Sequence, residues 1–158
     1  LGADDRGAEL IKNLEENLEL VETAVNIVFR KLSDFTNEKE GFQFIKEAFY
    51  SPNEISKEVK NQWNLWFDKY SDRLNKEGLS SKKRKAIMDA KNPKYILRNY
   101  MSQMAIEEAE KGNYSLIEEL YQLIKRPYDE QLGQEKWFAK RPEWARNKVG
   151  CSMLSCSS

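Results

Sequence analysis

The sequence feature that most constrains the fold is the stretch from residue 92 to residue 131, where helix start and stop signals surround two apolar stripes. Asn92 can cap a helix, and Pro93 suits a first turn, where no backbone N–H is required. Gly112 is placed to end that helix in a left-handed conformation. Between these signals, apolar residues recur at helical spacing: Leu97, Tyr100, Met101, Met104, Ala105 and Ala109. The stretch predicts a helix from Asn92 to Gly112.

A second helix is predicted directly after Gly112. Ser115 and Glu118 have the spacing of a capping box, and Pro127 cannot continue a helix. The expected buried stripe between these signals is Ile117, Leu120, Tyr121 and Ile124. Residues 92–124 should therefore form an antiparallel helix pair that turns at residues 112–115.

The N-terminal region has the apolar spacing of one long helix from Leu10 to Leu32. The stripe alternates between steps of three and four residues, as in a heptad seam: Ile11, Leu14, Leu18, Val21, Val25, Val28 and Leu32. Further apolar residues widen it: Leu20, Ala24, Ile27 and Phe29. We therefore favour a helix buried in a bundle, with a coiled-coil dimer as the alternative.

Three further helices are expected between residues 42 and 90. The first covers residues 42–49, and Ser51 or Asn53 could cap the second, which ends at Gly78. Ser80 or Ser81 starts the third. The stripe of the second helix is rich in aromatic residues, whose helical spacing favours core packing over a ligand-stacking platform: Ile55, Val59, Trp63, Trp66, Phe67, Tyr70 and Leu74.

The pattern decays after residue 131. Residues 132–149 predict an irregular strap anchored by Trp137, Phe138 and Trp144, and residues 150–158 predict a flexible tail. No stretch alternates with period two for long enough to predict a sheet. The expected fold is all-α: an irregular bundle of about five or six helices over residues 1–149, with a C-terminal strap and a flexible tail.

Composition excludes several classes of function. The 26 basic and 26 acidic side chains cancel, so no global field favours binding to nucleic acid or membranes. No apolar run approaches the roughly 20 residues of a membrane span. The chain has no histidine, and no two of its seven glycines share a phosphate-binding loop. We therefore predict no catalytic, cofactor-binding or metal-binding residue in this chain.

Several sequence motifs resemble the C-terminal region of the selenoprotein O family. They are NPKYILRNY, AIEEAEKGNYS and RPYDEQ, with FRKLS at residues 29–33, WFDKYSDRL at residues 66–74, and the closing SCSS. They follow one another in the family's order and cover most of the chain. The residues that carry the central match are Asn92, Pro93, Arg98, Asn99, Tyr100, Arg126, Pro127, Tyr128, Asp129 and Glu130.

The resemblance implies a function for a longer protein. Members of this family have a kinase-like fold, are often called pseudokinases, and transfer AMP from ATP to protein hydroxyls. ATP and Mg²⁺ or Mn²⁺ would bind in a kinase-like N-terminal region, and this chain would pack on that region and be inert alone. The expected location is the cytoplasm of a bacterium, or the mitochondrion of a eukaryote. The alternative is a stand-alone helical interaction domain, with dimerisation through the Leu14–Leu32 seam.

Three groups of charged residues are candidate sites. Glu107, Glu108 and Glu110 should form a solvated face, whereas Asp129 and Glu130 should form a structural ion pair with Arg126. A basic cluster could meet phosphates, but we favour docking on an acidic surface of the kinase-like region, because the overall charge of the chain is balanced. Arg98 could pair with a buried carboxylate. The cluster is Lys82, Lys83, Arg84, Lys85, Lys91, Lys94 and Arg98.

The two cysteines, Cys151 and Cys156, both lie near the chain end, and their spacing suits no common metal site. Two cysteines so placed cannot staple a fold, which indicates a reducing compartment. The resemblance implies a redox role for Cys156, because the family ends in Cys-Ser-Ser or selenocysteine-Ser-Ser. Its partner would be Cys151 or a cysteine of the kinase-like region.

Overall fold

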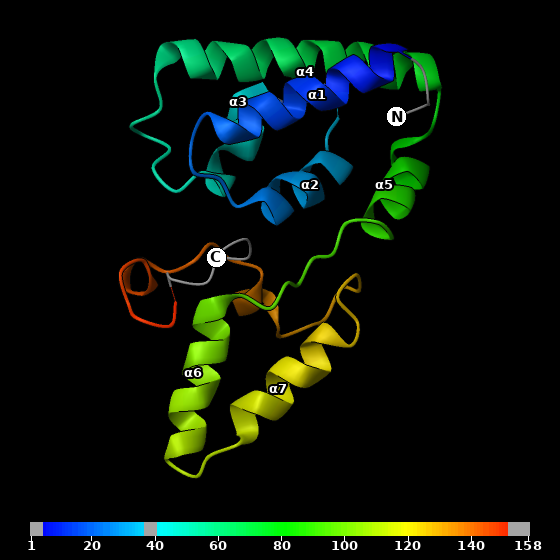
Figure 1. Cartoon of the computed structure of the whole chain (residues 1–158). Helices are drawn as coiled ribbons and strands as arrows, with labels where there is room; N and C mark the ends of the chain where they lie inside the picture. The colour runs from blue at the N-terminus through cyan, green and yellow to red at the C-terminus, as the bar shows by residue number, and fades with distance from the viewer. Residues whose placement is uncertain (1–4, 37–40, 152–158) are drawn as a thin grey trace. The chain divides into compact units, whose positions relative to one another are not determined.

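The computed structural model describes residues 5–36 and 41–151, and it confirms the all-α prediction. The described residues form seven α-helices and three 3-10 helices, without a β-strand. No helix among them is both long and apolar enough to cross a membrane. Contacts divide the chain into two compact units, which we call unit 1 (residues 1–90) and unit 2 (residues 91–158). Figure 1 shows the helices of each.

Unit 1 is built on one long helix, α4 (Lys57–Glu77), whose buried face is the predicted aromatic stripe. The side chain of Ser56 caps the helix by accepting a hydrogen bond from Val59 N (3.3 Å). The prediction of Ser51 or Asn53 as the cap was wrong because those residues lie in a separate turn before the helix. Gly78 ends the helix, as predicted, and it lies in the left-handed region with φ 63°.

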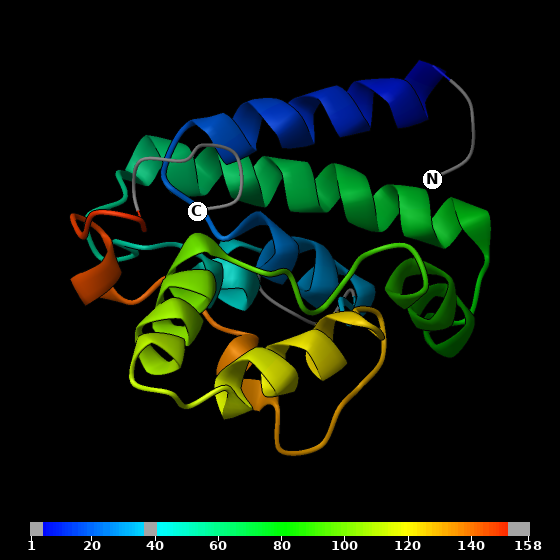
Figure 2. The ribbon, with the colours of Figure 1, turned by 60° about the horizontal axis from the view of Figure 1, so that its bottom comes forward.

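The helix α1 (Asp5–Glu19) packs along α4, as Figures 1 and 2 show. Leu10 and Leu14 face the core, and the indole N–H of Trp66 donates to the Leu10 carbonyl oxygen (2.9 Å). The aromatic residues of α4 contact one another, for example Trp66 and Tyr70, whose stacked rings lie 4.9 Å apart. This confirms the prediction that the aromatic stripe is core.

The predicted continuous helix from Leu10 to Leu32 was wrong, because the chain breaks between α1 and α2 (Val25–Ser33). The intervening segment pairs with residues 48–50: Ala24 N donates to Ala48 O (2.8 Å), and Thr23 forms an isolated bridge with Phe49. The break removes the uninterrupted seam that a coiled-coil dimer requires.

The remaining elements of unit 1 are α3 (Gly41–Ile45), η1 (Lys46–Ala48) and α5 (Ser81–Asp89). The first two together match the predicted helix over residues 42–49. Ser80 caps α5 by accepting from Lys83 N (3.3 Å), which settles the choice between Ser80 and Ser81. Buried aromatic side chains from the segments between helices, such as Phe35 and Phe49, complete the core.

Unit 2 contains the predicted helix pair as α6 (Asn99–Glu110) and α7 (Ser115–Ile124), but α6 begins seven residues later than predicted. Asn92 is not a cap, since residues 92–98 are not helical and Leu97 is exposed. The segment stays outside the helix because the amides of Lys94 and Tyr95 both donate to the Pro127 carbonyl oxygen, 2.8 and 3.1 Å away. A contact with a distant residue therefore replaces the predicted first turns.

The turn between α6 and α7 confirms one predicted signal and corrects another. Gly112 has the expected positive φ, 82°. The predicted capping box at Ser115 and Glu118 does not form, because Asn113 Oδ1 accepts from both the amide (3.1 Å) and the hydroxyl (2.8 Å) of Ser115. Glu118 instead accepts a hydrogen bond from Gln122 (2.6 Å).

The buried stripe of α7 is rotated relative to the prediction. Leu120 and Leu123 are buried, whereas Ile117 and Tyr121 are about half exposed. The strap that follows is irregular, as predicted, with short helices η2 (Glu135–Trp137) and η3 (Glu143–Ala145). These segments enclose the core of unit 2: Tyr95, Tyr100, Met101, Ala105, Leu120, Leu123, Trp137, Ala145 and Cys151.

Candidate functional site

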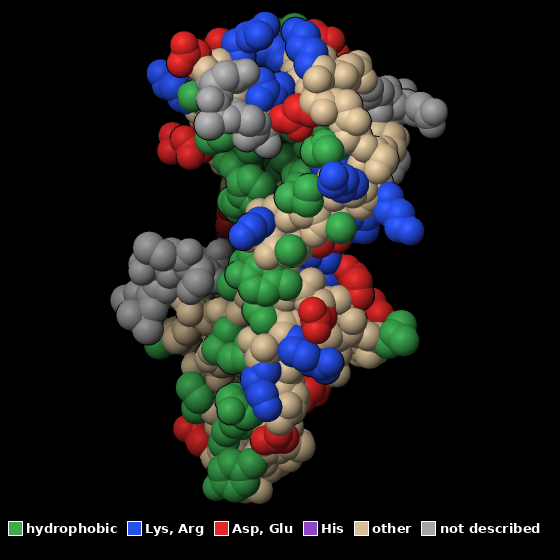
Figure 3. All heavy atoms as spheres, turned by 90° about the vertical axis from the view of Figure 1, so that its right-hand side faces the viewer, with side chains coloured by type: hydrophobic (Ala, Val, Ile, Leu, Met, Phe, Trp, Pro, Cys, Tyr) green, Lys and Arg blue, Asp and Glu red, His purple; other side chains and the backbone are tan. Residues whose placement is uncertain are grey.

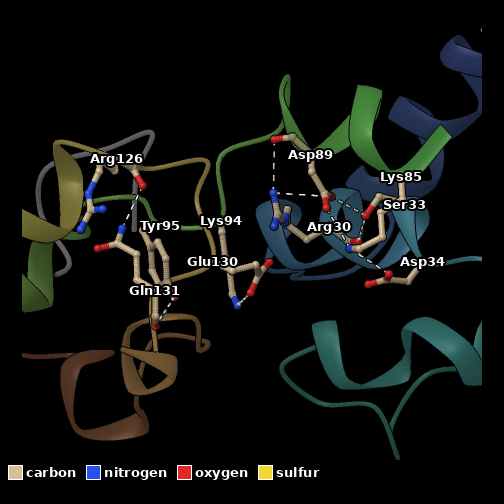
Figure 4. Close-up of polar contacts among 10 residues, drawn as sticks. All are labelled: Arg30, Ser33, Asp34, Lys85, Asp89, Lys94, Tyr95, Arg126, Glu130 and Gln131. Atoms are coloured by element: carbon tan, nitrogen blue, oxygen red, sulfur yellow. Dashed lines mark hydrogen bonds and ion pairs between the residues drawn. The ribbon is translucent and has the colours of Figure 1, made fainter. Parts of the chain in front are cut away.

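The motifs NPKY and RPYDEQ meet in unit 2 through residue pairs that are 36 apart in sequence, and they form a connected polar cluster (Figure 4). The side-chain amide of Gln131 donates to the carbonyl oxygens of Leu123 (3.0 Å) and Arg126 (2.8 Å). The hydroxyl of the buried Tyr95 donates to the carbonyl oxygen of Gln131 (3.4 Å). Because these bonds satisfy carbonyls at the C-terminal end of α7, the cluster fixes how that helix ends.

The charged residues of this cluster pair differently from the prediction. Glu130 forms its ion pair with Lys94 rather than with Arg126. The Lys94 ammonium also lies over the rings of Tyr95 (5.6 Å) and Phe138 (5.3 Å). Lys94 therefore links the two motifs.

The other residues of RPYDEQ lie at the surface. Arg126, Tyr128 and Asp129 are exposed, and Pro127 contributes through its carbonyl oxygen. The amide of Asp129 donates to the Arg126 carbonyl oxygen (3.2 Å), which closes a tight turn. The motif thus holds a turn whose exposed side chains face solvent in this chain.

The first motif places its remaining residues around the start of α6. Asn92 and Pro93 are half-buried in the non-helical segment before α6, and Asn99 is the first residue of that helix. Arg98 is only 6% exposed, and Tyr100 packs its ring edge-on against Trp144 at 6.1 Å. A carboxylate partner for Arg98 stays a prediction.

A second polar cluster, in unit 1, was not predicted from the sequence (Figure 4). Asp89, at the end of α5, accepts a hydrogen bond from the hydroxyl of Ser33 (2.6 Å) and pairs with Lys85 (2.8 Å). The guanidinium of Arg30 lies 3.5 Å from the same carboxylate and donates to the Asp89 carbonyl oxygen (3.2 Å). Lys85 also pairs with Asp34 (2.9 Å). These contacts fasten α5 to α2.

The electrostatics of this second cluster keep it ionised. Burial favours the neutral acid, but hydrogen bonds from Lys85 and Ser33 and the charge of Arg30 outweigh it and lower the pKa of Asp89. Burial likewise opposes the charge of Lys85, yet its carboxylate partners raise its pKa. An acid held ionised in this way is a structural anchor and a poor proton donor.

The glutamates on α6 are also unsuited to acid–base chemistry. Hydrogen bonding to Lys148 lowers the pKa of Glu107, and hydrogen bonding to Lys111 lowers the pKa of Glu108. Glu110 is exposed. No group of three or more potential metal-ligating side chains occurs among the described residues. These acids therefore belong to a solvated, salt-bridged face.

The predicted basic cluster is largely engaged within the two units. Arg84 is buried and donates to the Phe35 carbonyl oxygen, and Lys85 and Lys94 form the ion pairs given above. Its exposed members on α5 and after it are Lys82, Lys83 and Lys91. This arrangement leaves a smaller basic surface than the sequence indicated.

Cys151 is fully buried in the core of unit 2 and is a free thiol. Its amide donates to the Lys148 carbonyl oxygen (3.0 Å), and Gly150 between them adopts a left-handed φ of 86°. The prediction that Cys151 belongs to a loose tail was therefore wrong. Cys156 lies outside the described residues.

Sequence reasoning missed the roles of Tyr95, Gln131 and Asp89. Tyr95 and Gln131 belong to the two motifs, so motif membership was a signal that they matter. Asp89 is the lone acid within the basic cluster, which was a weaker signal. Their partners, 36 residues away for Tyr95 and 56 for Asp89, have no signature in local spacing.

Comparison with known proteins places this chain beside a single family. A family model described as "Protein adenylyltransferase SelO" matches residues 2–125. The chain is 52% identical over 153 residues to the "Protein nucleotidyltransferase YdiU" of Flavobacterium johnsoniae, covering 95% of this chain and 29% of that protein. Proteins of the same name from Aromatoleum aromaticum and Xanthomonas oryzae are 41% and 40% identical, each over 98% of this chain. The chain spans 29% and 30% of their lengths.

Proposed function

Because this chain belongs to the SelO protein adenylyltransferase family, we propose that it is the C-terminal helical part of a longer protein that transfers AMP from ATP to Ser, Thr and Tyr hydroxyls of other proteins. The observation that carries the proposal is the identity of 52% across 95% of the chain, which corresponds to only 29% of the Flavobacterium johnsoniae relative. The names of the relatives support nucleotidyl transfer as the reaction class.

The chemistry would belong to the part of the protein that this sequence does not include. The chain has no histidine and no glycine-rich phosphate loop, and its acids near Lys148 and Lys111 are held ionised. ATP and Mg²⁺ or Mn²⁺ would bind in the kinase-like region, together with the protein substrate. The chain by itself would be catalytically inert.

The role proposed for this chain is structural, as a helical region that packs on the kinase-like region. Two features support it. The contacts between NPKY and RPYDEQ use the family-like residues to end α7 and to join the two motifs. The Arg30–Asp89 cluster in unit 1 likewise fastens helices together. Such a scaffold would act in the cytoplasm of a bacterium, or in the mitochondrion if the source is eukaryotic.

A redox role for Cys156 is the second part of the proposal. Its thiolate would attack a small-molecule disulfide, release one small thiolate and form a mixed disulfide. A second protein thiolate would then displace the remaining small thiolate and close a protein disulfide. Burial of Cys151 favours a cysteine of the kinase-like region as that second thiol.

The experiment for the transferase proposal uses ATP labelled in its α-phosphate and a generic protein acceptor. The longer protein should label the acceptor, and this chain alone should neither bind Mg-ATP in calorimetry nor transfer label. The proposal would be contradicted if this chain alone bound ATP with micromolar affinity. It would also be contradicted if the longer protein, although folded, transferred no label to the acceptor.

The redox proposal is tested by mapping thiols with mass spectrometry after treatment with oxidised glutathione. Cys156 should enter a disulfide in the longer protein, and Cys156→Ser should abolish it. Cys151→Ser is the matched control and should leave that disulfide in place. A free Cys156 after oxidation, with AMP transfer unaffected by dithiothreitol, would remove the redox role.

A further inference from the structure

The apolar surface of α7 extends beyond its buried stripe, and this outer part stays exposed in the described part of the chain. Tyr114 directly precedes the helix, and Ile117 and Tyr121 follow at spacings of three and four residues, so the three share one side. Their exposed fractions are 65%, 45% and 54%. We call these three residues the outer face of α7. Figure 3 shows hydrophobic side chains exposed on unit 2.

This face differs from the ordinary scatter of apolar residues on a protein surface. The adjoining side of α7 carries the buried residues Leu120 and Leu123. An apolar surface that extends beyond the buried stripe is typical of a helix that is buried over a wider arc. The spacing i, i+3, i+7 is also the pattern by which a helix inserts anchors into an apolar groove.

We propose that the remainder of the longer SelO-family polypeptide packs on the outer face of α7, an inference that rests on the proposed function. The supporting observation is length: the chain corresponds to only 29–30% of its relatives, so more than two thirds of each relative has no counterpart here. A surface covered by that missing region is left exposed when this chain is considered alone. A region tethered to the chain would also have a high effective concentration at the face.

The charges beside the face indicate the chemistry of its partner surface. Lys125 follows α7 and places its ammonium 5.4 Å from the centre of the Tyr121 ring. Gln122 and Glu118 bond to each other on the polar side of the helix. The matching surface should therefore be an apolar groove for Tyr114, Ile117 and Tyr121, with a carboxylate near Lys125.

The test compares this chain with a chimera in which it replaces the matching segment of the Flavobacterium johnsoniae relative. Hydroxyl-radical footprinting with mass spectrometry should oxidise Tyr114 and Tyr121 readily in the chain and lose that labelling in the chimera. Ile117→Lys should lower the melting temperature of the chimera and leave that of the chain unchanged. Gln122→Lys adds the same charge on the polar side of the helix and should leave the melting temperatures of both the chimera and the chain unchanged.

Three results would overturn the inference. Equal oxidation of the two tyrosines in chain and chimera would show that the face stays open. A dimer of the chain in light scattering that Ile117→Lys dissociates would assign the face to a second copy. If the chimera does not fold, hydrogen exchange of the unmodified relative tests the same packing. Amide exchange in its segment aligned with α7 should be slower than exchange in α7 of this chain. Equal exchange rates would refute the packing. Protected tyrosines without AMP transfer would instead count against the proposed function.

Discussion

The two units bury their cores in different ways. In unit 1 one helix, α4, supplies a row of aromatic side chains that contact one another, such as Trp66 and Phe67 with ring centroids 5.2 Å apart. In unit 2 two short helices are enclosed by segments without regular structure, and much of the order comes from backbone carbonyls bonded to Gln131, Lys94 and Tyr95. The core of unit 1 is therefore dominated by the aromatic side chains of one helix, with long-range hydrogen bonds such as Ser33–Asp89 added to it. In unit 2 the long-range hydrogen bonds hold the segments outside its two helices.

This difference explains why one unit has a long helix and the other does not. Burial of aromatic area is non-directional and tolerates small shifts, so a periodic stripe is sufficient to specify α4. A buried carbonyl oxygen requires a hydrogen-bond donor in a defined position. The irregular segments of unit 2 therefore need specific donor residues at specific sequence positions.

The largest expected effect is the loss of an aromatic residue from unit 1. Trp63 is completely buried, and Trp63→Ala should lower the free energy of unfolding by about 4 kcal/mol because it leaves a large cavity. Urea denaturation followed by near-ultraviolet circular dichroism measures this loss. Hydrogen exchange should show faster opening in α4 than in α7. Equal acceleration in both helices would mean that the two units unfold as one.

The second prediction removes an aliphatic residue from the smaller core. Leu123 is 1% exposed, and Leu123→Ala should cost about 3 kcal/mol by the same mechanism. The control is Ile117→Ala on the same helix, whose side chain is 45% exposed and should matter little in this chain. If both variants lose the same stability in urea denaturation, the rotated stripe of α7 is wrong.

The apolar stripes and the helix ends show which parts of the fold could be predicted from the sequence. The aromatic stripe and the left-handed Gly78 and Gly112 were predictable, because spacing and conformational freedom are local properties. The start of α6 was not predictable, because the amides of Lys94 and Tyr95 bond to Pro127, which is distant in sequence. Long-range contacts outweighed a favourable Asn-Pro start signal.

The third prediction concerns the polar cluster of unit 1. Asp89→Asn removes the charge that faces Arg30, whose side chain is only 5% exposed, and should cost about 2 kcal/mol at pH 7. Ser33→Ala, which deletes one hydrogen bond and no charge, should cost less. Thermal denaturation of both variants ranks them, and a larger loss for Ser33→Ala would contradict this account of the cluster.

The same cluster gives a dependence on pH. Folding lowers the pKa of Asp89 below its ordinary value of 3.8, so its contribution is complete above that pH and is lost as the pH falls through the lower, folded value. Asp89→Asn should therefore lose less stability than the unmodified chain between neutral and strongly acidic pH. Parallel acid titrations would show instead that the folded pKa of Asp89 is not lowered.

The polar sites were less predictable than the fold, for the same physical reason. The sequence indicated that RPYDEQ matters and that Arg126 should pair with a neighbouring acid, yet Glu130 pairs with Lys94. Local spacing favours pairs within a few residues, whereas the folded chain offers partners that spacing cannot reveal. Burial of Cys151 was unpredictable for a similar cause, because it depends on how the strap brings Trp137 and Ala145 into the same core.

The smallest effect provides a matched test across the two units. Gly78 and Gly112 both follow a helix with positive φ, 63° and 82°, and at neither glycine would an added Cβ meet another heavy atom within 4 Å. Replacing either by Ala should therefore cost only the conformational penalty of a side chain in the left-handed region, about 1 kcal/mol.

Because no clash contributes at either glycine, the two penalties should agree even though the surrounding cores differ. Melting of Gly78→Ala and Gly112→Ala, each beside its Gly→Asn counterpart, measures this, and Asn should recover part of the loss because it tolerates the left-handed region. Agreement would locate the difference between the units in their cores rather than in their helix ends. A much larger loss at Gly112 would mean that the α6–α7 turn also positions the helices of unit 2, and the contrast between packing and hydrogen bonding would then have to include the turn.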